Sequence, residues 1–573
     1  MHFFAKKAVD FPPWNVYHQR KKDVSLLAVR MPAILEAIMH ISERSIMSTI
    51  QNPILRGFHP DPSILCVGED YYIATSTFEW FPGVQIYHSR DLVRWELIAR
   101  PLDRLSQLNM LGEDNSCGVW APCLSYDNGT YYLIYTDVKS FIGSFKDTHN
   151  YLVTAKDIRG PWSEPVYLNS SGFDPSLFHD SDGRKYLVNM LMDHTSFNGK
   201  FAGIVLQEYS VEEQKLVGPV HNIFKGTPAG LAEGPHLYRH DGWYYLMMAE
   251  GGTGYAHAVT VVRSRQLTGP YEMDPQLHLL TTKHQPWYPI QKAGHGSLIH
   301  AANGRWYVAH LCGRPVGEDR RCILGRETAL QEVVWKDGWL RLKNGTNCPD
   351  AALEIPDTDA LPVSRNLHED FDGDGWDIHF QTLRVPLAER ASLSARKGWL
   401  RLTGAESLNS KFHQSLLAHR QQSFYCQVET KLEFHPRHFQ QMAGLTYFYN
   451  TQCYYYLYLS REEHLGRVLS VMKCDLGQGT LPLGAGIPLP GDGPVYLRVT
   501  TSRETARFSW SLDGTTFTDI GGTLDATILS DDYFESTGHG MFTGAFFGIC
   551  CQDLSGQKCF ADFDYFDYKE LDD

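Results

Sequence analysis

A hairpin pattern that occurs five times restricts the fold of residues 47–345 more than any other feature of the sequence. Each copy has a Pro (Gly in the last copy), an apolar run, a polar turn, and a second apolar run that begins near Tyr or Trp. The copies align on Pro62, Pro122, Pro175, Pro235 and Gly296, at spacings of 60, 53, 60 and 61 residues. Weaker strand-like segments lie between them, and helical periodicity is almost absent. About four strands per repeat predict an all-β, five-bladed β-propeller, and five hairpins in one phase disfavour an irregular β-sandwich.

The residues at the head of each copy are chemically unusual. In a propeller the first strand of every blade lines the central axis, so equivalent positions of different blades converge at one mouth. These positions predict a pocket that contains three carboxylates, an aromatic ring and an imidazole. They are occupied by Asp61, Trp120, Asp174, Glu233 and His295.

Each of these residues also has a purely structural interpretation. A single Asp before Pro is a common turn residue, and only the shared phase of the repeats favours a functional role. His295 could be a structural histidine or a ligand for an ion in the propeller channel. Its position at a blade head favours the pocket, and one imidazole does not make a metal site.

Paired carboxylates in one pocket indicate cleavage of a glycosidic bond, with one group as acid and the other as base or nucleophile. Glu233 has the longer reach to a leaving oxygen and is the predicted general acid, which leaves Asp61 as the predicted base. Asp174 is expected to raise the pKa of the acid and to orient it. A non-catalytic carbohydrate-binding propeller and a protein-docking scaffold are the alternatives from other classes. Motifs of serine hydrolases, phosphate-binding loops and dinucleotide sites are not evident.

The pattern changes near residue 345. Residues 346–365 are rich in Pro and Asp and are predicted to be a linker. Residues 366–573 contain short alternating runs that predict a β-sandwich. The segment from Asp370 to Asp377 resembles part of a calcium loop, but Leu383 stands where such a loop needs Glu. A turn that leads into a strand is the better interpretation.

Composition restricts location and partners. The net charge of -14 argues against nucleic acid or an anionic membrane as a partner. The 12 cysteines form no zinc or disulfide pattern, which favours reduced thiols in a cytoplasmic protein. No apolar run reaches the about 20 residues of a membrane span, and no signal peptide is evident. Residues 1–46 are interpreted as an extension outside the core fold, with Met47 as the hypothetical functional start.

Several motifs together resemble glycoside hydrolase family 43, in its long form with a C-terminal β-sandwich, from about residue 50 to the C-terminus. They are "NPILRGFHPDPSI", "YYIATSTFEWFPGVQIYHSRDLVRW", "VWAPCLSY", "FDPSLF", "AEGPHLY", "KAGHGSLI" and "LGRETA". The resemblance implies an inverting mechanism with Asp61 as base, Asp174 as modulator and Glu233 as acid.

The same resemblance implies a set of sugar-binding residues. Phe78 and Trp120 match pocket-wall aromatics, and the sugar-contacting positions match Thr253, His295 and Arg326. A Phe of the sandwich closes the pocket in such enzymes. Here the candidates are Phe542 and Phe546, of which Phe546 is favoured.

The resulting hypothesis is an exo-acting, inverting β-xylosidase that releases xylose from the non-reducing ends of short β-1,4-xylo-oligosaccharides. The resemblance allows side activity on α-L-arabinofuranosides, and an enzyme that is mainly an α-L-arabinofuranosidase is the alternative. No cofactor or metal is expected to be required, and calcium in the propeller channel is not indicated. The sequence leaves open whether the chain forms a homo-oligomer.

Overall fold

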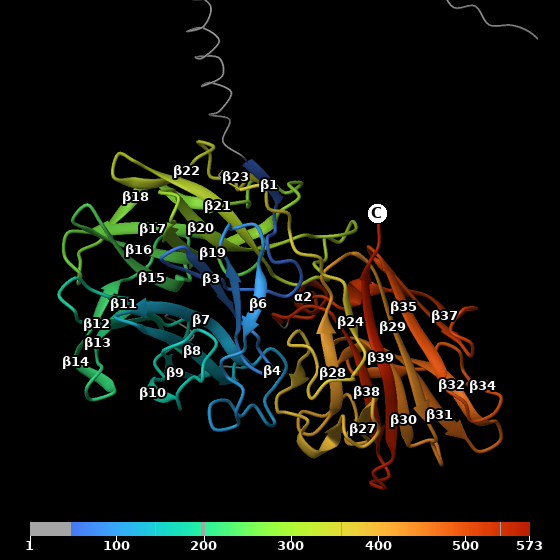
Figure 1. Cartoon of the computed structure of the whole chain (residues 1–573). Coiled ribbons are helices and arrows are strands. Elements are labelled where there is room, and N and C mark those ends of the chain that lie inside the picture. The colour runs from blue at the N-terminus through green and yellow to red at the C-terminus, as the bar shows by residue number, and fades with distance from the viewer. Residues whose placement is uncertain (1–46, 144, 196–200, 357, 539, 573) are drawn as a thin grey trace, which may run out of the picture.

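The chain folds into two β-rich bodies that lie side by side, as seen in a computed structural model (Figure 1). The structure describes residues 47–572 except 144, 196–200, 357 and 539. In this part of the chain the α-helical element is the short α2 (Asp531–Glu535), and the 3-10 turns are η1 (Ala388–Arg390) and η2 (Ala526–Ile528). None of the described helices has the length and apolar character needed to cross a membrane. The extension 1–46, on which the proposed start at Met47 depends, lies outside the described part of the chain.

The N-terminal body consists of five four-stranded antiparallel sheets, each built from consecutive segments of the chain. The prediction of a five-bladed propeller is confirmed. The first blade contains β2 (Ser63–Val67), β3 (Asp70–Thr75), β5 (Gln85–Ser89) and β6 (Glu96–Ala99). The second blade contains β7 (Gly118–Asp127), β8 (Thr130–Ser140), β9 (Asp147–Ala155) and β10 (Val166–Asn169). The third blade contains β11 (Ser176–His179), β12 (Lys185–Met192), β13 (Phe201–Ser210) and β14 (Lys215–Phe224). The last two are β15 (Glu233–His240), β16 (Trp243–Glu250), β17 (Ala258–Ser264) and β18 (Glu272–Thr281), and β19 (Gln291–His300), β20 (Trp306–Gly313), β21 (Glu327–Lys336) and β22 (Trp339–Leu342).

The first strand of every blade lies at the centre of the ring. Strand β2 contacts β7, β7 contacts β11, β11 contacts β15, β15 contacts β19, and β19 contacts β2 again. Burial follows this order: nine of the ten residues of β19 are buried, whereas β14 at the rim is mostly exposed. Strand β19 is thus covered by its neighbours in the ring, whereas the rim strand β14 faces solvent.

The two ends of the propeller are joined by the segment that precedes the first blade. The Asn52 side chain donates to Leu330 O and accepts from Leu330 N, both at 2.9 Å, and so imitates a strand residue beside β21. Strand β1 (Met47–Gln51) pairs with β23 (Ala352–Pro356). The predicted linker 346–365 thus contains a strand that binds back to the propeller, which its Pro-rich composition did not indicate.

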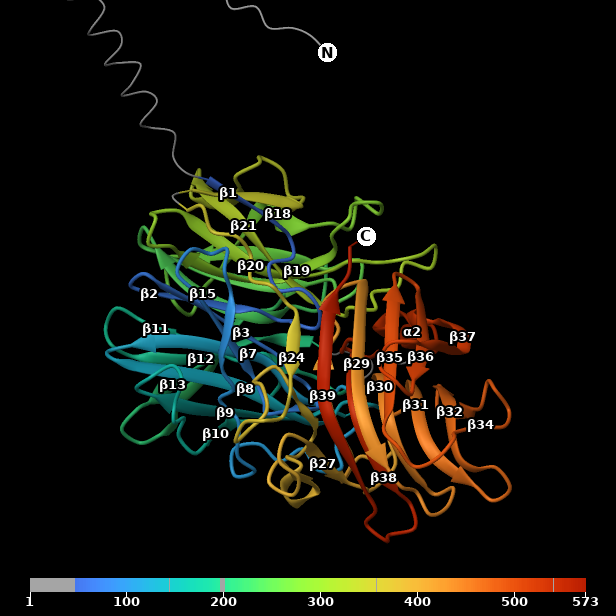
Figure 2. The ribbon, with the colours of Figure 1, turned by 45° about the vertical axis from the view of Figure 1, so that its right-hand side comes forward.

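The C-terminal body is a sandwich of two antiparallel sheets, which confirms the predicted β-sandwich (Figure 2). One sheet contains β24 (Leu367–Glu369), β26 (Ala391–Ser392), β27 (Leu400–Thr403), β29 (Tyr425–Phe434), β35 (Val495–Ser502), β36 (Thr505–Ser511), β37 (Thr518–Asp525) and β39 (Phe560–Glu570). The other contains β28 (Ser415–Arg420), β30 (Gln441–Asn450), β31 (Cys453–Glu462), β32 (Gly466–Asp475), β33 (Gln478–Thr480), β34 (Ile487–Pro488) and β38 (Phe546–Asp553). In β29 every second residue is buried, as expected for a strand with one face toward the opposite sheet.

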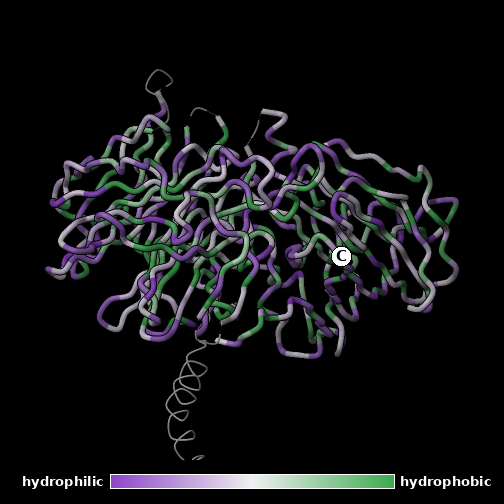
Figure 3. The backbone as a smooth tube through the Cα atoms, turned by 90° about the horizontal axis from the view of Figure 1, so that it is seen from above, coloured by the Kyte–Doolittle hydropathy of each residue, from purple (hydrophilic) through white to green (hydrophobic). Residues whose placement is uncertain are grey.

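Propeller and sandwich share an interface that combines apolar packing with hydrogen bonds and an ion pair. Strand β4 (Trp80–Phe81) of the propeller pairs with β25 (Thr382–Leu383) of the sandwich side. The buried Lys292 and Asp532 form an ion pair across the interface at 2.5 Å. Hydrophilic segments dominate the outermost loops of both bodies (Figure 3). The interface fixes the sandwich over one end of the propeller axis, where the blade heads meet.

Candidate active site

The blade heads meet in a small pocket of about 220 Å3 at the mouth of the propeller. All the residues predicted for the pocket line it except Phe546. Lys146, Phe173, Gly252 and Phe542 complete the wall, and the predicted residues that line it are Asp61, Phe78, Trp120, Asp174, Glu233, Thr253, His295 and Arg326. The structure therefore brings together three carboxylates from three different blades, although they are far apart in the sequence.

The backbone at several of these positions is in the left-handed region. The φ angles are +55° at Asp61, +54° at Asp174, +46° at His295 and +51° at Phe78. Non-glycine residues in this region cost on the order of 1–3 kcal/mol each and cluster at functional sites. A left-handed residue thus recurs at the heads of three blades, and the side chains of Asp61, Asp174 and His295 all line the pocket.

Asp61 is held as an ionised carboxylate. It is 5% exposed, and its Oδ2 accepts a hydrogen bond from Ser76 Oγ at 2.6 Å. Its Oδ1 accepts from Arg326 Nη1 at 3.2 Å and lies 3.8 Å from His295 Nδ1. Burial alone would raise the pKa of Asp61, but Arg326, His295 and Ser76 outweigh it, so the pKa is lower than that of an ordinary Asp.

The pKa values of Asp174 and Glu233 shift in the opposite direction, upward. Burial, the neighbouring Glu233 and then Asp61 raise the pKa of Asp174 well above its usual value. Burial also raises the pKa of Glu233 to about 7; Asp61 adds to this rise and Lys146 opposes it. Two carboxyls with raised pKa values thus share the pocket with one whose pKa is lowered. This separation is what acid–base chemistry needs.

A glycine permits the close packing of the third and fifth blade heads against the fourth. Gly234 N donates to Asp174 Oδ2 at 3.0 Å, which fixes the orientation of that carboxyl beside Glu233. Gly234 has a φ of +57°, and a Cβ there would lie 2.9 Å from the His295 ring. Any larger residue would push His295 or the Asp174 contact out of place.

Arg326 connects the propeller part of the pocket to the sandwich. Its Nη1 also donates to Thr253 Oγ1 at 3.0 Å, and its Nη2 donates to Phe542 O at 3.0 Å. Phe542 N in turn donates to Ser116 Oγ at 3.0 Å. A sandwich segment is therefore tied to the propeller at two points, and its Phe542 side chain forms one wall of the pocket.

The preference for Phe546 as the closing aromatic is wrong. Phe546 is fully buried and stacks on Trp80, with 3.9 Å between the ring centres. It is the first residue of β38, where its side chain belongs to the packing between the two bodies. Phe542 lies before the strand begins, and its ring centre is 5.5 Å from that of Trp120.

Three residues that line the pocket were not predicted, namely Lys146, Phe173 and Gly252. Lys146 places its Nζ 5.3 Å from the Trp120 ring centre and 4.8 Å from that of Phe173, in position for cation–π contacts with both. Phe173 directly precedes Asp174, so its position in the repeat could have identified it as a pocket residue. Lys146 comes from the loop between β8 and β9, and the equivalent loops of the first, fourth and fifth blades also supply pocket residues. These loops lie outside the aligned hairpins, so the repeat gave no signal for Lys146 or for Ser76, which binds Asp61 from behind the pocket.

No cluster of three or more His, Cys, Asp or Glu side chains within the described residues is arranged to hold a metal ion. The chemistry that the pocket offers is that of its own carboxyl groups, its guanidinium and its aromatic walls.

A propeller with converging carboxylates, closed by a sandwich, defines a glycoside hydrolase, and the comparisons with known proteins agree. Residues 50–340 match the glycosyl hydrolases family 43, and residues 368–569 match the beta xylosidase C-terminal concanavalin A-like domain. The chain belongs to glycosyl hydrolases family 43.

Similar proteins cover nearly the whole chain. The "Xylosidase/arabinosidase 43B" of Humicola insolens is 51% identical over 534 residues, which cover 92% of this chain and 98% of the relative. The "Beta-xylosidase" of Bacillus subtilis (strain 168) is 49% identical and covers 91% and 99%. The crystal structure of xylan beta-1,4-xylosidase from Bacillus halodurans C-125 has a TM-score of 0.88 and 55% identity, and covers 91% and 100%.

Proposed function

We propose that this family 43 enzyme is an exo-acting, inverting β-xylosidase that removes xylose from the non-reducing ends of short β-1,4-xylo-oligosaccharides. The observation that carries the proposal is the meeting of Asp61, Asp174 and Glu233 in one closed pocket, with Asp61 paired to Arg326 and Glu233 left without a salt-bridge partner among the described residues. The relatives named above support the choice of sugar.

The proposed reaction is a single displacement. Asp61 accepts a proton from a water molecule, and the water oxygen attacks the anomeric carbon. Glu233 donates its proton to the glycosidic oxygen as that bond breaks, so the leaving sugar departs as a neutral alcohol. Such a reaction needs the two carboxyls about 6.5–9.5 Å apart, because the water lies between the base and the sugar. Asp174 orients Glu233 and favours its protonated form.

The rest of the wall is proposed to position one terminal sugar. Phe78 and Trp120 offer flat apolar faces, and Thr253 and His295 offer hydrogen-bonding groups to sugar hydroxyls. Phe542 and its backbone contacts close one side of the small pocket. An oligosaccharide can therefore enter the pocket only by its end. This arrangement favours release of single sugars over cleavage within a chain.

A second activity, on terminal α-L-arabinofuranosides, is favoured by the double name of the Humicola insolens relative. Measurement of kcat/KM on 4-nitrophenyl β-D-xylopyranoside and 4-nitrophenyl α-L-arabinofuranoside distinguishes the two. We expect the xyloside to be the better substrate and xylotriose to yield xylose and xylobiose first. A higher kcat/KM on the arabinofuranoside would overturn the preference, and absence of hydrolysis of both would favour a carbohydrate-binding propeller.

We also propose that the enzyme works in the cytoplasm on imported oligosaccharides. All 12 cysteines are unpaired, which suits a reducing compartment. Fractionation of native cells, with an antibody against the enzyme, should recover it with cytoplasmic markers; recovery from the medium would contradict this location.

A further inference from the structure

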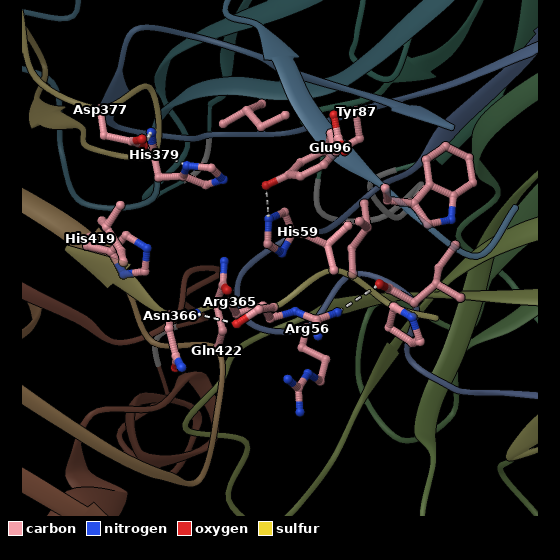
Figure 4. A pocket seen from close by; sticks show the side chains of 18 of the residues that line it. Arg56, His59, Tyr87, Glu96, Arg365, Asn366, Asp377, His379, His419 and Gln422 are labelled. Carbon is pink, nitrogen blue, oxygen red and sulfur yellow. Dashed lines mark hydrogen bonds and ion pairs between the residues drawn. The ribbon is translucent and has the colours of Figure 1, made fainter. Parts of the chain in front are cut away.

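A second cavity lies at the interface between propeller and sandwich, and it shares no lining residue with the catalytic pocket. Its volume is about 340 Å3, within the range of small-molecule sites. Figure 4 shows His59, His379 and His419 around one space, with Arg365 on another side of it. These residues come from both bodies, so a ligand here would contact propeller and sandwich at once.

The surroundings of this cavity contain arginines without carboxylate partners. Among the described residues, Arg365 makes one hydrogen bond, from Nη2 to Ile54 O at 3.2 Å, and no ion pair. Two more arginines lie behind the lining. Arg100 donates to Ile378 O at 2.7 Å, and Arg420 donates to Phe58 O at 2.7 Å and to the Gln381 side chain. Neither has an ion-pair partner in the described part of the chain.

The nearby acidic groups are engaged or lie at the rim. Asp377 accepts from both the backbone N and the ring Nδ1 of His379, at 2.8 and 2.7 Å. Glu570 forms an ion pair with Arg56 at 2.6 Å. Glu96 lines the cavity as an exposed residue. The buried end of the cavity therefore has an excess of positive charge.

Buried polar atoms at this end have no partner in the described structure. They include Nδ1 of His59, Nδ1 of His419 and Nη1 of Arg100. His59 is 1% exposed and His419 is 2% exposed, and both line the cavity. Unpaired buried polar groups are uncommon, and a water, an ion or a ligand can satisfy them.

Burial disfavours the charge on the arginines here. It lowers the pKa of Arg100 to about 9, with a further contribution from Arg420, and lowers the pKa of Arg365 to about 10. It also lowers the pKa of Arg420 to about 10. A bound anion would stabilise all three guanidinium groups. Buried charges without partners are costly, so the interface would gain stability from such a ligand.

Part of the cavity wall is apolar and includes Ile54, Val93, Trp95 and Leu367. We propose that this interdomain cavity is a binding site for a sugar-sized organic anion, whose carboxylate or phosphate lies among Arg365, His59 and His419 and whose body lies against the apolar wall.

The test is isothermal titration calorimetry of the full chain with D-glucuronate, D-glucose 6-phosphate and D-glucose. The three share a sugar body and differ in the group at carbon 6, so they separate carboxylate, phosphate and neutral ligands. We expect at least one anion to bind and glucose not to bind. Equal binding of glucose, or no binding of either anion at millimolar concentration, would overturn the proposal.

Two variants locate the site. Arg365→Gln should weaken anion binding at least tenfold, whereas Arg326→Gln, which removes the guanidinium of the catalytic pocket, should leave it unchanged. The reverse pattern would place the anion in the catalytic pocket and overturn the proposal.

Val363→Trp provides a test that does not depend on the folding of the Arg365 variant. Val363 lines the cavity and is 37% exposed, so a larger side chain there obstructs the space without loss of charge. This variant should lose anion binding and keep xylosidase activity. Unchanged affinity in Val363→Trp would contradict the proposed location.

Discussion

At the scale of single residues, Asp61 and Glu233 differ in what surrounds them more than in their own chemistry. Asp61 accepts hydrogen bonds from the guanidinium of Arg326 and the hydroxyl of Ser76, while Glu233 is buried beside other carboxyls. Glu233→Gln should therefore reduce kcat on xylobiose by about 10²–10⁴-fold, the usual contribution of a general acid. On 2,4-dinitrophenyl β-D-xyloside the loss should be much smaller, because that leaving group needs no proton.

Asp61→Asn is the matched comparison, since attack by water needs the base with either leaving group. It should lose activity on both substrates by a similar factor, with thermal unfolding of both variants measured as a control for folding. A Glu233→Gln variant that is equally impaired on both substrates would contradict the assignment of the acid.

The pKa shifts also predict the pH dependence of kcat/KM. The base must be ionised, and the lowered pKa of Asp61 places the acidic limb below the ordinary range of a carboxyl. The acid must be protonated, and the pKa of Glu233 of about 7 places the loss of activity where the pH rises through about 7. An alkaline limb above pH 9, measured with xylobiose, would contradict Glu233 as the titrating acid.

Asp174→Asn tests the neighbouring carboxyl in the same measurement. It removes a group that can carry negative charge beside Glu233, so the alkaline limb should move to lower pH while Asp61 and the acidic limb are unaffected. A variant with lower kcat but an unshifted alkaline limb would mean that Asp174 acts by orientation alone.

How far the sequence predicts the site depends on whether a residue belongs to the repeat. Asp61, Asp174, Glu233 and His295 lie one or two residues before the aligned Pro or Gly of their repeats, so the propeller geometry brings them together. Lys146 reaches the pocket from the loop between β8 and β9, outside the aligned hairpin, and its place depends on tertiary contacts that no periodicity records.

At the scale of secondary structure elements, the start of β38 decides which aromatic reaches the pocket. Phe546 lies inside the strand and packs on Trp80, whereas Phe542 precedes it and is held by Ser116 and Arg326. Two aromatic residues four positions apart in a Gly-rich segment cannot be distinguished without the position at which the strand begins. The strand β23 was missed for a related reason, because its partner β1 lies some 300 residues earlier in the chain.

This difference in position predicts contrasting effects of substitution at Phe542 and Phe546. Phe542→Ala should raise KM for xylobiose with little change in the free energy of unfolding, because one wall of the pocket is lost. Phe546→Ala should lower the free energy of unfolding by about 3–5 kcal/mol, as for other fully buried Phe residues. Kinetics and urea unfolding of both variants check this. A larger KM effect from Phe546→Ala, with intact stability, would restore the original preference.

At the scale of the whole molecule, the sequence predicted both bodies because each has a strong strand period, but not how they fit together. The buried ion pair Lys292–Asp532 and the pairing of β4 with β25 each join two segments that are far apart in the chain. The sequence patterns of these segments do not indicate that they are partners. The cavity between the bodies is likewise a product of assembly and has no signature in the sequence.

The boundary of the folded chain can be tested by truncation. A protein that begins at Met47 should keep the kcat/KM and thermal stability of the full chain, since β1 and its pairing with β23 remain. A protein that begins at Asn52 lacks β1 and should unfold at a lower temperature. Loss of activity on removal of residues 1–46 would show that the extension belongs to the working enzyme.

The central claim is a single displacement at the anomeric carbon by a water that Asp61 activates. Proton NMR of the xylose first released from the non-reducing end of xylobiose tests it most directly, before mutarotation mixes the anomers. We predict α-xylose as the first product, because one displacement inverts the β-linkage. Initial appearance of β-xylose would show retention and contradict the proposed roles of Asp61 and Glu233.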